Sequence, residues 1–599
     1  MRHPKASVGY ENWWALWPDL LREELEAFSK RGIAPRTLYQ AHGILILEAE
    51  WPVHGHSDPI RLRIGFSPLH PYFRPAVGAP DEKFERHQNP LTKELCLLTQ
   101  ETGQWNPRQL VSDFIEERLK QLLAALDARK EKRWDDAARL EEQAPDPLMP
   151  YFAGAEDDSV ILFDGSMPVP PNGHGLMDVV CMSRNSARNQ AAFEGILRQV
   201  KNSSGVGVGK RFAFPNEPAG AQVVTARWVK FTPPAAMDAA ELLLLAEKEL
   251  ETQAVLQGPS VRKLNQFAAG PFSITGIVFP DEIEYGQQKK GAGWLFLASR
   301  RGLVTGNEQN PAETQLIIGK RAGKDDIFSR LPVARSLLNK SVVVVGCGAI
   351  GGFAALELAR AGVGRVAFVD YDTVEPGNSL RWPLGRTAWG SPKAVALANF
   401  VLANYPWTTP TAFGANLGAA TSAPDTLPPD LNENVLSPIL DVLREANLVV
   451  DTSASFEVQY ALSYYCRRLK VPYVMGYATV GLAGGVVARF VHDSKSCLVC
   501  LHEHRKDEKH ISKPRLDSTG IVTPLGCNAP TFTGGGFDLQ EVSLEVVRSA
   551  VGLLSEGKYD PGTWQVSILT LQGENGVRVL PSWEAFHCPP HPRCCGAGE

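Results

Sequence analysis

The sequence predicts a multidomain protein that combines α/β and α+β domains. Its 599 residues exceed what one hydrophobic core normally holds. Over residues 341–370 a strand, a glycine turn, a helix and a second strand follow in order, which is typical of a doubly wound α/β sheet. Residues 13–126 instead predict a helix, a strand meander and a second helix, which is an α+β order. We therefore expect domains at 1–150, 151–325 and 326–599.

The composition excludes several classes of partner. A hydrophobic content of 44% and a charged content of 21% are typical of a soluble globular chain. The net charge of −5 provides no basic footprint for nucleic acid. We see neither a signal peptide nor an apolar run of membrane-spanning length, so we expect a cytoplasmic protein without membrane partners. Ten cysteines spread over the chain favour nucleophiles, metal ligands or core residues over a disulfide scaffold.

The N-terminal third predicts an alternation of helix, strands and ordered loop. Apolar residues at helical spacing indicate one amphipathic helix at its start, and the prolines of HPYFRP favour an extended loop after the strands. The charge-dense stretch after the second helix predicts a solvated helix or hinge. These elements are a helix over Trp13–Ser29, strands over Gly43–Glu50 and Ile60–Phe66, the loop His70–Pro75 and the charged stretch Arg129–Gln143.

Cys96 lies between two leucines, which by itself is typical of a buried hydrophobic side chain. His87 and Asn89 closely precede it, and Trp105–Pro107 opens the next helix. This order resembles the ubiquitin-conjugating fold. The resemblance implies that Cys96 carries a thioester and that His87 and Asn89 match the ends of the family's His-Pro-Asn triplet, although the order here is His-Gln-Asn-Pro. The side-chain amide of Asn89 would then donate to the oxyanion that develops when an amine attacks.

The middle of the chain predicts an α/β linking domain without a catalytic constellation. Strand-like stretches at Val160–Phe163, Val223–Phe231 and Trp294–Ala298 surround a leucine-rich helix at Ala239–Leu256. The run Gly205–Lys210 lacks the serine or threonine that a phosphate loop needs after its lysine.

The glycine turn after the strand at residues 342–345 predicts a Rossmann-like nucleotide site. Gly346 permits a tight turn, Gly348 lets a phosphate approach the backbone, and Gly351 lets helix and strand pack closely. Asp370, at the end of the second strand, is placed to bind ribose hydroxyls. This pattern alone fits an NAD enzyme as well as an ATP enzyme.

The residues after the turn decide for ATP. Asp370, Asp372, Asn378 and Arg381 occur in the order D-x-D-x-V-x-x-x-N-x-x-R, and Lys393 ends a G-S-P-K motif. This pattern resembles the ThiF, MoeB and ubiquitin-activating family, which implies that Arg381 and Lys393 steady the phosphates of ATP. An enzyme that cleaves ATP must offset the charge of departing pyrophosphate. In this resemblance Asp451, which ends the strand over 447–451, matches the aspartate that holds Mg²⁺.

Cysteines near the C-terminus predict a structural zinc site. Two-residue spacing of thiolates suits tetrahedral zinc, and relatives of the family close the site with a second pair. A redox role for the first pair is the alternative. The predicted ligands are Cys497 and Cys500 with Cys588, Cys594 and Cys595.

Cys527 resembles the acceptor cysteine of thioester-forming relatives, because Asn528 and Pro530 follow it within a glycine-rich stretch. Cys347 and Cys466 lie inside apolar runs and are predicted to be structural.

The two resemblances together point to a bacterial fusion of a ubiquitin-activating-like adenylation domain with a ubiquitin-conjugating-like domain, similar to the fused enzymes of CBASS anti-phage operons. The resemblance implies that a partner's C-terminal carboxylate is adenylated, passed to Cys527 and Cys96, and joined to an amine of an acceptor protein. The partner would be a cyclic-oligonucleotide synthase or a ubiquitin-like protein. It also implies a homodimer, in which Arg321 or Arg330 of a partner subunit completes the ATP site. The alternatives are a sulfur-carrier adenylyltransferase and a non-catalytic scaffold.

Overall fold

The computed structural model divides the chain into two compact units, Met1–Gly323 (unit 1) and Lys324–Glu599 (unit 2). No helix within the described residues is long and apolar enough to cross a membrane. The structure describes residues 12–53, 58–97, 105–142, 144–152, 159–171, 173–185, 191–212, 222–234, 237–254, 265–267, 270–283, 285, 290–300, 304–305, 308–309, 313–418, 436–508, 510–516, 521–522, 531–532 and 534–595.

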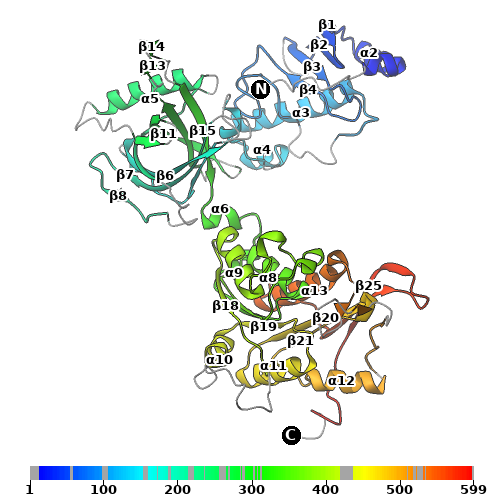
Figure 1. Ribbon diagram of the computed structural model, residues 1–599. Coiled ribbons are helices and arrows are strands. Elements are labelled where there is room, and N and C mark those ends of the chain that lie inside the picture. The colour runs from blue at the N-terminus through cyan, green and yellow to red at the C-terminus, as the bar shows by residue number, and fades with distance from the viewer. Residues whose placement is uncertain are drawn as a thin grey trace. The chain divides into compact units, whose positions relative to one another are not determined.

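The N-terminal part of unit 1 is an antiparallel meander in the order β1-β2-β3-β4, covered by helices (Figure 1). The predicted single helix over Trp13–Ser29 is two helices, because Pro18 has no N–H to continue the first helix and opens the second. Both predicted strands are confirmed, as β2 and β3. The elements are α1 (Trp13–Leu16), α2 (Pro18–Lys30), β1 (Arg36–Ala41), β2 (Ile44–Trp51), β3 (Ile60–Phe66), β4 (Ala76–Gly78), α3 (Val111–Lys130), α4 (Trp134–Leu140) and η1 (Met149–Tyr151).

The charged stretch after α3 is not a solvated hinge throughout. Although α4 is partly exposed, Glu141 directly after it is buried. Arg129 and Arg86 contact its carboxylate and neutralise it, and the local sequence gives no sign of these partners.

The C-terminal part of unit 1 is a β-barrel rather than the predicted α/β linking domain. Strands β11, β12, β15, β5, β7, β6 and β9 pair in this order, and β9 pairs again with β11. Because the ring closes on itself, its inner face needs no covering helices, and alternate residues of β6 such as Met177, Val179 and Cys181 fill the interior. The elements are β5 (Val160–Phe163), β6 (His174–Asn185), β7 (Ala191–Lys201), β8 (Gly207–Val208), β9 (Gln222–Lys230), α5 (Ala239–Ala254), β10 (Asn265–Phe267), β11 (Gly270–Glu282), β12 (Lys290–Arg300), β13 (Val304–Thr305), β14 (Glu308–Gln309) and β15 (Glu313–Arg321).

Unit 2 is an eight-stranded sheet in the order β18-β17-β16-β19-β20-β21-β24-β25. The strands from β18 to β20 are parallel, and the remaining pairs are antiparallel. The predicted strand, glycine turn and helix are confirmed as β16 and α8. The elements are α6 (Lys324–Phe328), α7 (Ala334–Leu337), β16 (Ser341–Val345), α8 (Ala349–Arg360), β17 (Arg365–Val369), η3 (Pro376–Leu380), η4 (Arg386–Ala388), α9 (Lys393–Asn404), β18 (Thr409–Phe413), α10 (Leu436–Glu445), β19 (Leu448–Asp451), α11 (Phe456–Leu469), β20 (Tyr473–Ala478), η7 (Val480–Leu482), β21 (Gly484–Phe490), α12 (Leu498–Asp507), β22 (Ile521–Val522), β23 (Thr531–Phe532), α13 (Gly536–Leu554), β24 (Val566–Gln572) and β25 (Arg578–Phe586).

Helices cover both faces of this sheet (Figure 1). Helices α8, α9 and α13 pack on one face, and α10, α11 and α12 pack on the other. The chain runs outward from β16 to β17 and β18 and then returns to β19 on the opposite side, so the strand order reverses between β16 and β19. Ligands of doubly wound sheets bind beyond the carboxyl ends of the strands at this point.

Candidate functional site

A cavity of about 800 Å³ lies beyond the carboxyl ends of β16, β17 and β19 in unit 2. Its volume is in the range of small-molecule sites. The motifs that the sequence spaces over residues 346–393 meet on its wall. The predicted residues that line it are Gly346, Gly348, Asp370, Asp372, Asn378, Arg381 and Lys393.

The three glycines of the turn have different neighbours. Gly346 has a φ of +82°, in the left-handed region that favours glycine, and a Cβ there would lie 2.5 Å from the Ser453 backbone. A Cβ at Gly351 would lie 1.9 Å from the Gly346 carbonyl oxygen. A Cβ at Gly348 would meet nothing within 4 Å, because this residue faces the open cavity at the start of α8. The geometry thus fits the expected division into turn, packing and ligand approach.

Asp370 fastens the glycine turn to the second strand. Its carboxylate accepts the backbone N–H of Cys347 at 2.6 Å and that of Asp372 at 2.7 Å. Burial raises the pKa of Asp370, and these amides oppose the increase. Asp370 also lines the cavity, which is compatible with the predicted contact with a ribose. That contact stays a prediction.

Positive side chains lie on the same wall. Lys393 Nζ is 2.8 Å from Asp372 Oδ2. Arg381 is half-buried, and burial lowers its pKa from the usual arginine value. Asn378 accepts the Glu375 N–H and thereby caps η3, the short helix that leads to Arg381. Two cations beside an anion-receptive turn can offset phosphate charge.

Asp451 does not lie on the cavity wall, so it does not have the position that the predicted contact with Mg²⁺ requires. Its side chain is fully buried. One oxygen accepts the Ser453 N–H and hydroxyl at 3.0 and 2.7 Å, and the other accepts the Tyr473 hydroxyl at 2.9 Å. Burial raises the pKa of Asp451. This carboxylate supports the loop after β19 instead of facing a ligand.

Other polar residues on the wall were missed by the sequence analysis. Asn416 comes soon after β18 and Ser453 soon after β19, while Glu457 lies in the first turn of α11, the helix that follows β19. That position in a parallel sheet was the available signal. Asp372 and Glu457 are partly or fully exposed carboxylates and have the oxygen donors that Mg²⁺ prefers.

Cys96 is exposed in unit 1 and lies between two small cavities. One, of about 290 Å³, is lined by Cys96 and Asn89, and the other by Cys96 and His87. The Asn89 side-chain oxygen accepts the N–H groups of Leu91 and Thr92 and so shapes the turn before the cysteine. The three predicted residues are therefore neighbours, while Cys527 lies outside the described residues.

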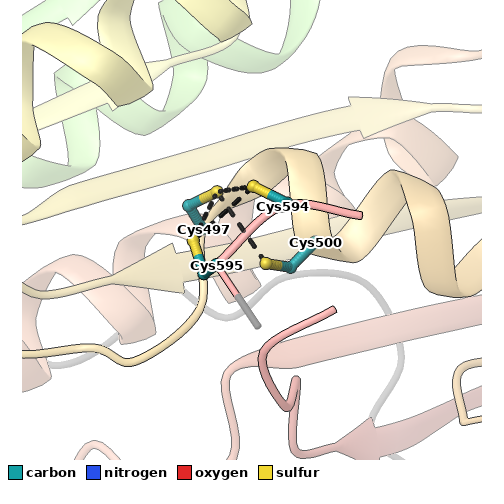
Figure 2. A group of neighbouring side chains, drawn as sticks. All are labelled: Cys497, Cys500, Cys594 and Cys595. Carbon is teal, nitrogen blue, oxygen red and sulfur yellow. Dashed lines mark hydrogen bonds between the residues drawn. The ribbon is translucent and has the colours of Figure 1, made fainter. Parts of the chain in front are cut away.

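Four cysteines of unit 2 form a cluster in which all sulfurs lie within 4.8 Å of one another (Figure 2). Cys497 Sγ is 4.0 Å from that of Cys500, 3.5 Å from that of Cys594 and 3.6 Å from that of Cys595. Tetrahedral zinc with Zn–S bonds of about 2.3 Å separates its sulfurs by about 3.8 Å. The cluster could therefore hold a zinc ion.

Cys588 is outside this cluster, so its predicted role as a zinc ligand is wrong. It is 3% exposed and packs in the core beside β24. Burial raises the pKa of its thiol to about 12. Its sulfur is not among the four that lie within 4.8 Å of one another.

Comparisons with known proteins match the cavity-bearing unit to a family. Residues 321–567 match the ThiF family model. The chain is 47% identical over 597 residues to the uncharacterized protein y4oA of Sinorhizobium fredii (strain NBRC 101917 / NGR234). The matched residues cover 99% of this chain and 99% of y4oA. Molybdopterin-synthase adenylyltransferase of Escherichia coli (strain K12) is 29% identical over 167 residues, 28% of this chain and 60% of that protein. The solved structure of E. coli MccB with ATP covers 44% of this chain and 68% of its own, at 14% identity and a TM-score of 0.32.

Gly348→Ala and Gly351→Ala separate the two roles of the glycine turn. Gly351→Ala forces a Cβ against the Gly346 carbonyl, so we expect the free energy of unfolding of unit 2 to fall by about 1–3 kcal/mol. Gly348→Ala adds a methyl group only to the cavity, so we expect a change within about 0.5 kcal/mol but a roughly tenfold weaker affinity for ATP. Urea unfolding and calorimetric titration measure the two quantities. Equal stability losses in both variants would contradict this assignment.

The cysteine cluster predicts one zinc ion per chain, measurable by elemental mass spectrometry. Cys594→Ser should lose the ion and lower the Tm, because it removes one of four ligands. Cys588→Ser is the matched control and should keep the ion. A disulfide between Cys497 and Cys500 in metal-free protein would instead favour the redox alternative.

Proposed function

We propose that unit 2 uses ATP to adenylate the C-terminal carboxylate of a protein or peptide. The chain belongs to the same family as the uncharacterized protein y4oA, and it carries a ThiF/MoeB-type adenylation domain. The observation that supports this most is the cavity at the strand-order reversal. It combines a glycine turn open to a ligand with Arg381 and Lys393 in the lining of the same cavity. A nicotinamide site has no need of these cations.

In the proposed first step, a carboxylate oxygen of the substrate attacks the α-phosphorus of ATP. A new P–O bond forms, the bond to the β,γ-pyrophosphate breaks, and pyrophosphate leaves with the electron pair. Arg381 and Lys393 offset the charge that builds on it. Asp372 and Glu457 would hold Mg²⁺, which supplies further charge neutralisation for the phosphates.

We further propose a relay of two thioesters. The Cys527 thiolate attacks the acyl carbonyl and releases AMP, Cys96 then accepts the acyl group by thioester exchange, and an amine finally displaces Cys96 to form an amide. Thiolates suit this relay because they are nucleophilic near neutral pH and their esters stay activated. The exposure of Cys96 and its position between two cavities support its part in the relay.

The resemblance to CBASS enzymes extends this proposal to a cyclic-oligonucleotide synthase as the activated protein and to a homodimer of adenylation units. Arg330 is exposed in unit 2, whereas Arg321 donates to the Ala292 carbonyl at 2.7 Å within the barrel of unit 1. Of the two, Arg330 is the better candidate for an arginine supplied to a second subunit. Light scattering measures whether the dimer forms.

ATP–pyrophosphate exchange tests the adenylation step. Arg381→Ala removes a cation from the cavity wall, so we expect the exchange rate to fall by about 10²–10³-fold. Arg386→Ala is the matched control, because Arg386 is exposed on η4 and does not line the cavity. Absence of exchange in the unmodified protein with the synthase partner present would favour a scaffold.

Adduct formation tests the relay. With ATP and the partner, Cys527→Ala should abolish thiol-reducible adducts at both cysteines, whereas Cys96→Ala should trap one at Cys527. Denaturing gels with and without reductant, followed by peptide mass spectrometry, locate them. An adduct on Cys96 in the Cys527→Ala variant would contradict the order of the relay. Exchange without any thioester would favour the sulfur-carrier alternative.

A further inference from the structure

Beneath Cys96 lies a buried group of charges, here called the ionic cluster: Arg86, His87, Arg129, Glu141 and Glu282. Glu141 is its centre, with a side chain only 2% exposed. Arg129 donates to its two oxygens at 2.7 and 2.8 Å, and Arg86 Nε lies 3.3 Å from Oε2. His87 Nε2 lies 3.7 Å from the same oxygen. Nothing in the local sequence pattern places either of these carboxylates in a site.

The barrel of unit 1 supplies the remaining wall of the ionic cluster. Glu282, at the end of β11, accepts a hydrogen bond from Arg86 Nη2 at 3.0 Å. The Tyr285 hydroxyl accepts one from Arg129 at 3.0 Å. Three stretches of sequence thus converge on Glu141: residues 86–87, the end of α3 and the end of β11. This gives the barrel a specific contact with the residue beside Cys96.

His87 connects the ionic cluster to the cysteine. The Cys96 N–H donates to the His87 carbonyl at 2.7 Å, so the two residues lie on paired segments. The imidazole is 4% exposed and hydrogen-bonds the Cys96 side chain. The backbone N–H of His87 donates to the Asp146 carboxylate at 2.9 Å, and His87 has a φ of 57°. The imidazole therefore lies between the thiol and Glu141.

The surroundings of His87 favour its protonated form. Burial acts to lower the pKa of His87, but the contacts with Cys96 and Glu141 and the charge of Asp146 outweigh it and raise the pKa to about 9. The other charged groups that face this region are Arg86 on the same segment, Arg118 and Arg129 on α3, Glu142 directly after Glu141, and Glu282 on β11. At neutral pH His87 is then an imidazolium, balanced by the buried carboxylates.

We propose that His87, oriented by Glu141, stabilises negative charge on Cys96 Sγ. In the thioester step, which rests on the proposed function, a neutral amine attacks the acyl carbonyl and the C–N bond forms. The C–S bond then breaks, its electron pair goes to Sγ, and the imidazolium gives its proton to that sulfur. The amine nitrogen loses a proton to solvent, and solvent reprotonates His87. His87 is thus a catalytic residue, and Glu141 is a positioning residue.

Alkylation of Cys96 tests this without any partner protein. Iodoacetamide reacts with the thiolate, so we expect His87→Gln to slow alkylation at neutral pH by about tenfold or more, with Glu141→Gln in the same direction. Glu131→Gln is the matched control. Glu131 is exposed between α3 and α4, so this variant should behave as wild type. Peptide mass spectrometry separates Cys96 from the other thiols, and circular dichroism checks folding. Equal rates in folded His87→Gln and wild type would overturn the proposal.

A second measurement uses the wild-type chain. Its outcome therefore does not depend on whether a variant with an altered ionic cluster folds. If His87 is the acid, modification of His87 itself by diethylpyrocarbonate, located by peptide mass spectrometry among the 13 histidines, should be slow near neutral pH and rise as pH passes through about 9, where the imidazolium loses its proton. A midpoint near the ordinary histidine value of about 6.5 would overturn the proposal.

Discharge of the Cys96 thioester to hydroxylamine tests the transfer step itself. We expect discharge by His87→Gln to be about 10²-fold slower, with ATP–pyrophosphate exchange unchanged. The wild-type advantage should shrink as the pH rises, because His87 then loses the proton that it gives to the leaving sulfur. Equal discharge rates would overturn the inference alone. If wild type forms no Cys96 adduct, the proposed relay fails, and the alkylation rates still decide the role of His87.

Discussion

The adenylation unit depends on one close approach, between the start of α8 and the glycine turn that precedes it. Gly351 lies against the Gly346 carbonyl, and Asp370 holds the intervening Cys347 N–H from the neighbouring strand. Trp382 adds a third tie, since its indole N–H donates to the Cys347 carbonyl at 2.7 Å. The backbone is thus fixed before any ligand arrives, so a bound phosphate would meet prearranged amides instead of having to order them.

The sequence predicted this turn well because its determinants are local. An apolar strand, three spaced glycines and a helix lie within twenty residues, and each has a steric reason that does not depend on distant contacts. Asp451 is a residue for which local sequence was not sufficient to predict the direction of the side chain. Its position at a strand end was predicted correctly, but the partner that turns its carboxylate inward, Tyr473, belongs to the next strand. Side-chain direction there depends on a neighbour that the motif does not contain.

The same limit applies to the cysteines and to the charged stretch after α3. The spacing of Cys497 and Cys500 was sufficient to predict half of the cysteine cluster, whereas the choice of Cys594 and Cys595 over Cys588 depends on how the C-terminal segment packs. Glu141 belongs to a run of charges that is typical of a solvated surface. Its burial follows from arginines that are 55 and 12 residues away in sequence. Periodicity carries no information about such partners.

Burying Glu141 is costly unless its charge is matched, and this explains why the ionic cluster has so many members. Removing one partner of a buried ion pair commonly costs about 3–5 kcal/mol, because the remaining charge stays desolvated. Arg86 and Arg129 lower the pKa of Glu141 against the effect of burial, so the carboxylate stays ionised beside His87. In turn, the low local dielectric strengthens the attraction between an imidazolium and a nearby sulfur anion. Because Glu282 and Tyr285 of the barrel accept hydrogen bonds from Arg86 and Arg129, the meander and the barrel of unit 1 support one electrostatic site rather than two independent folds.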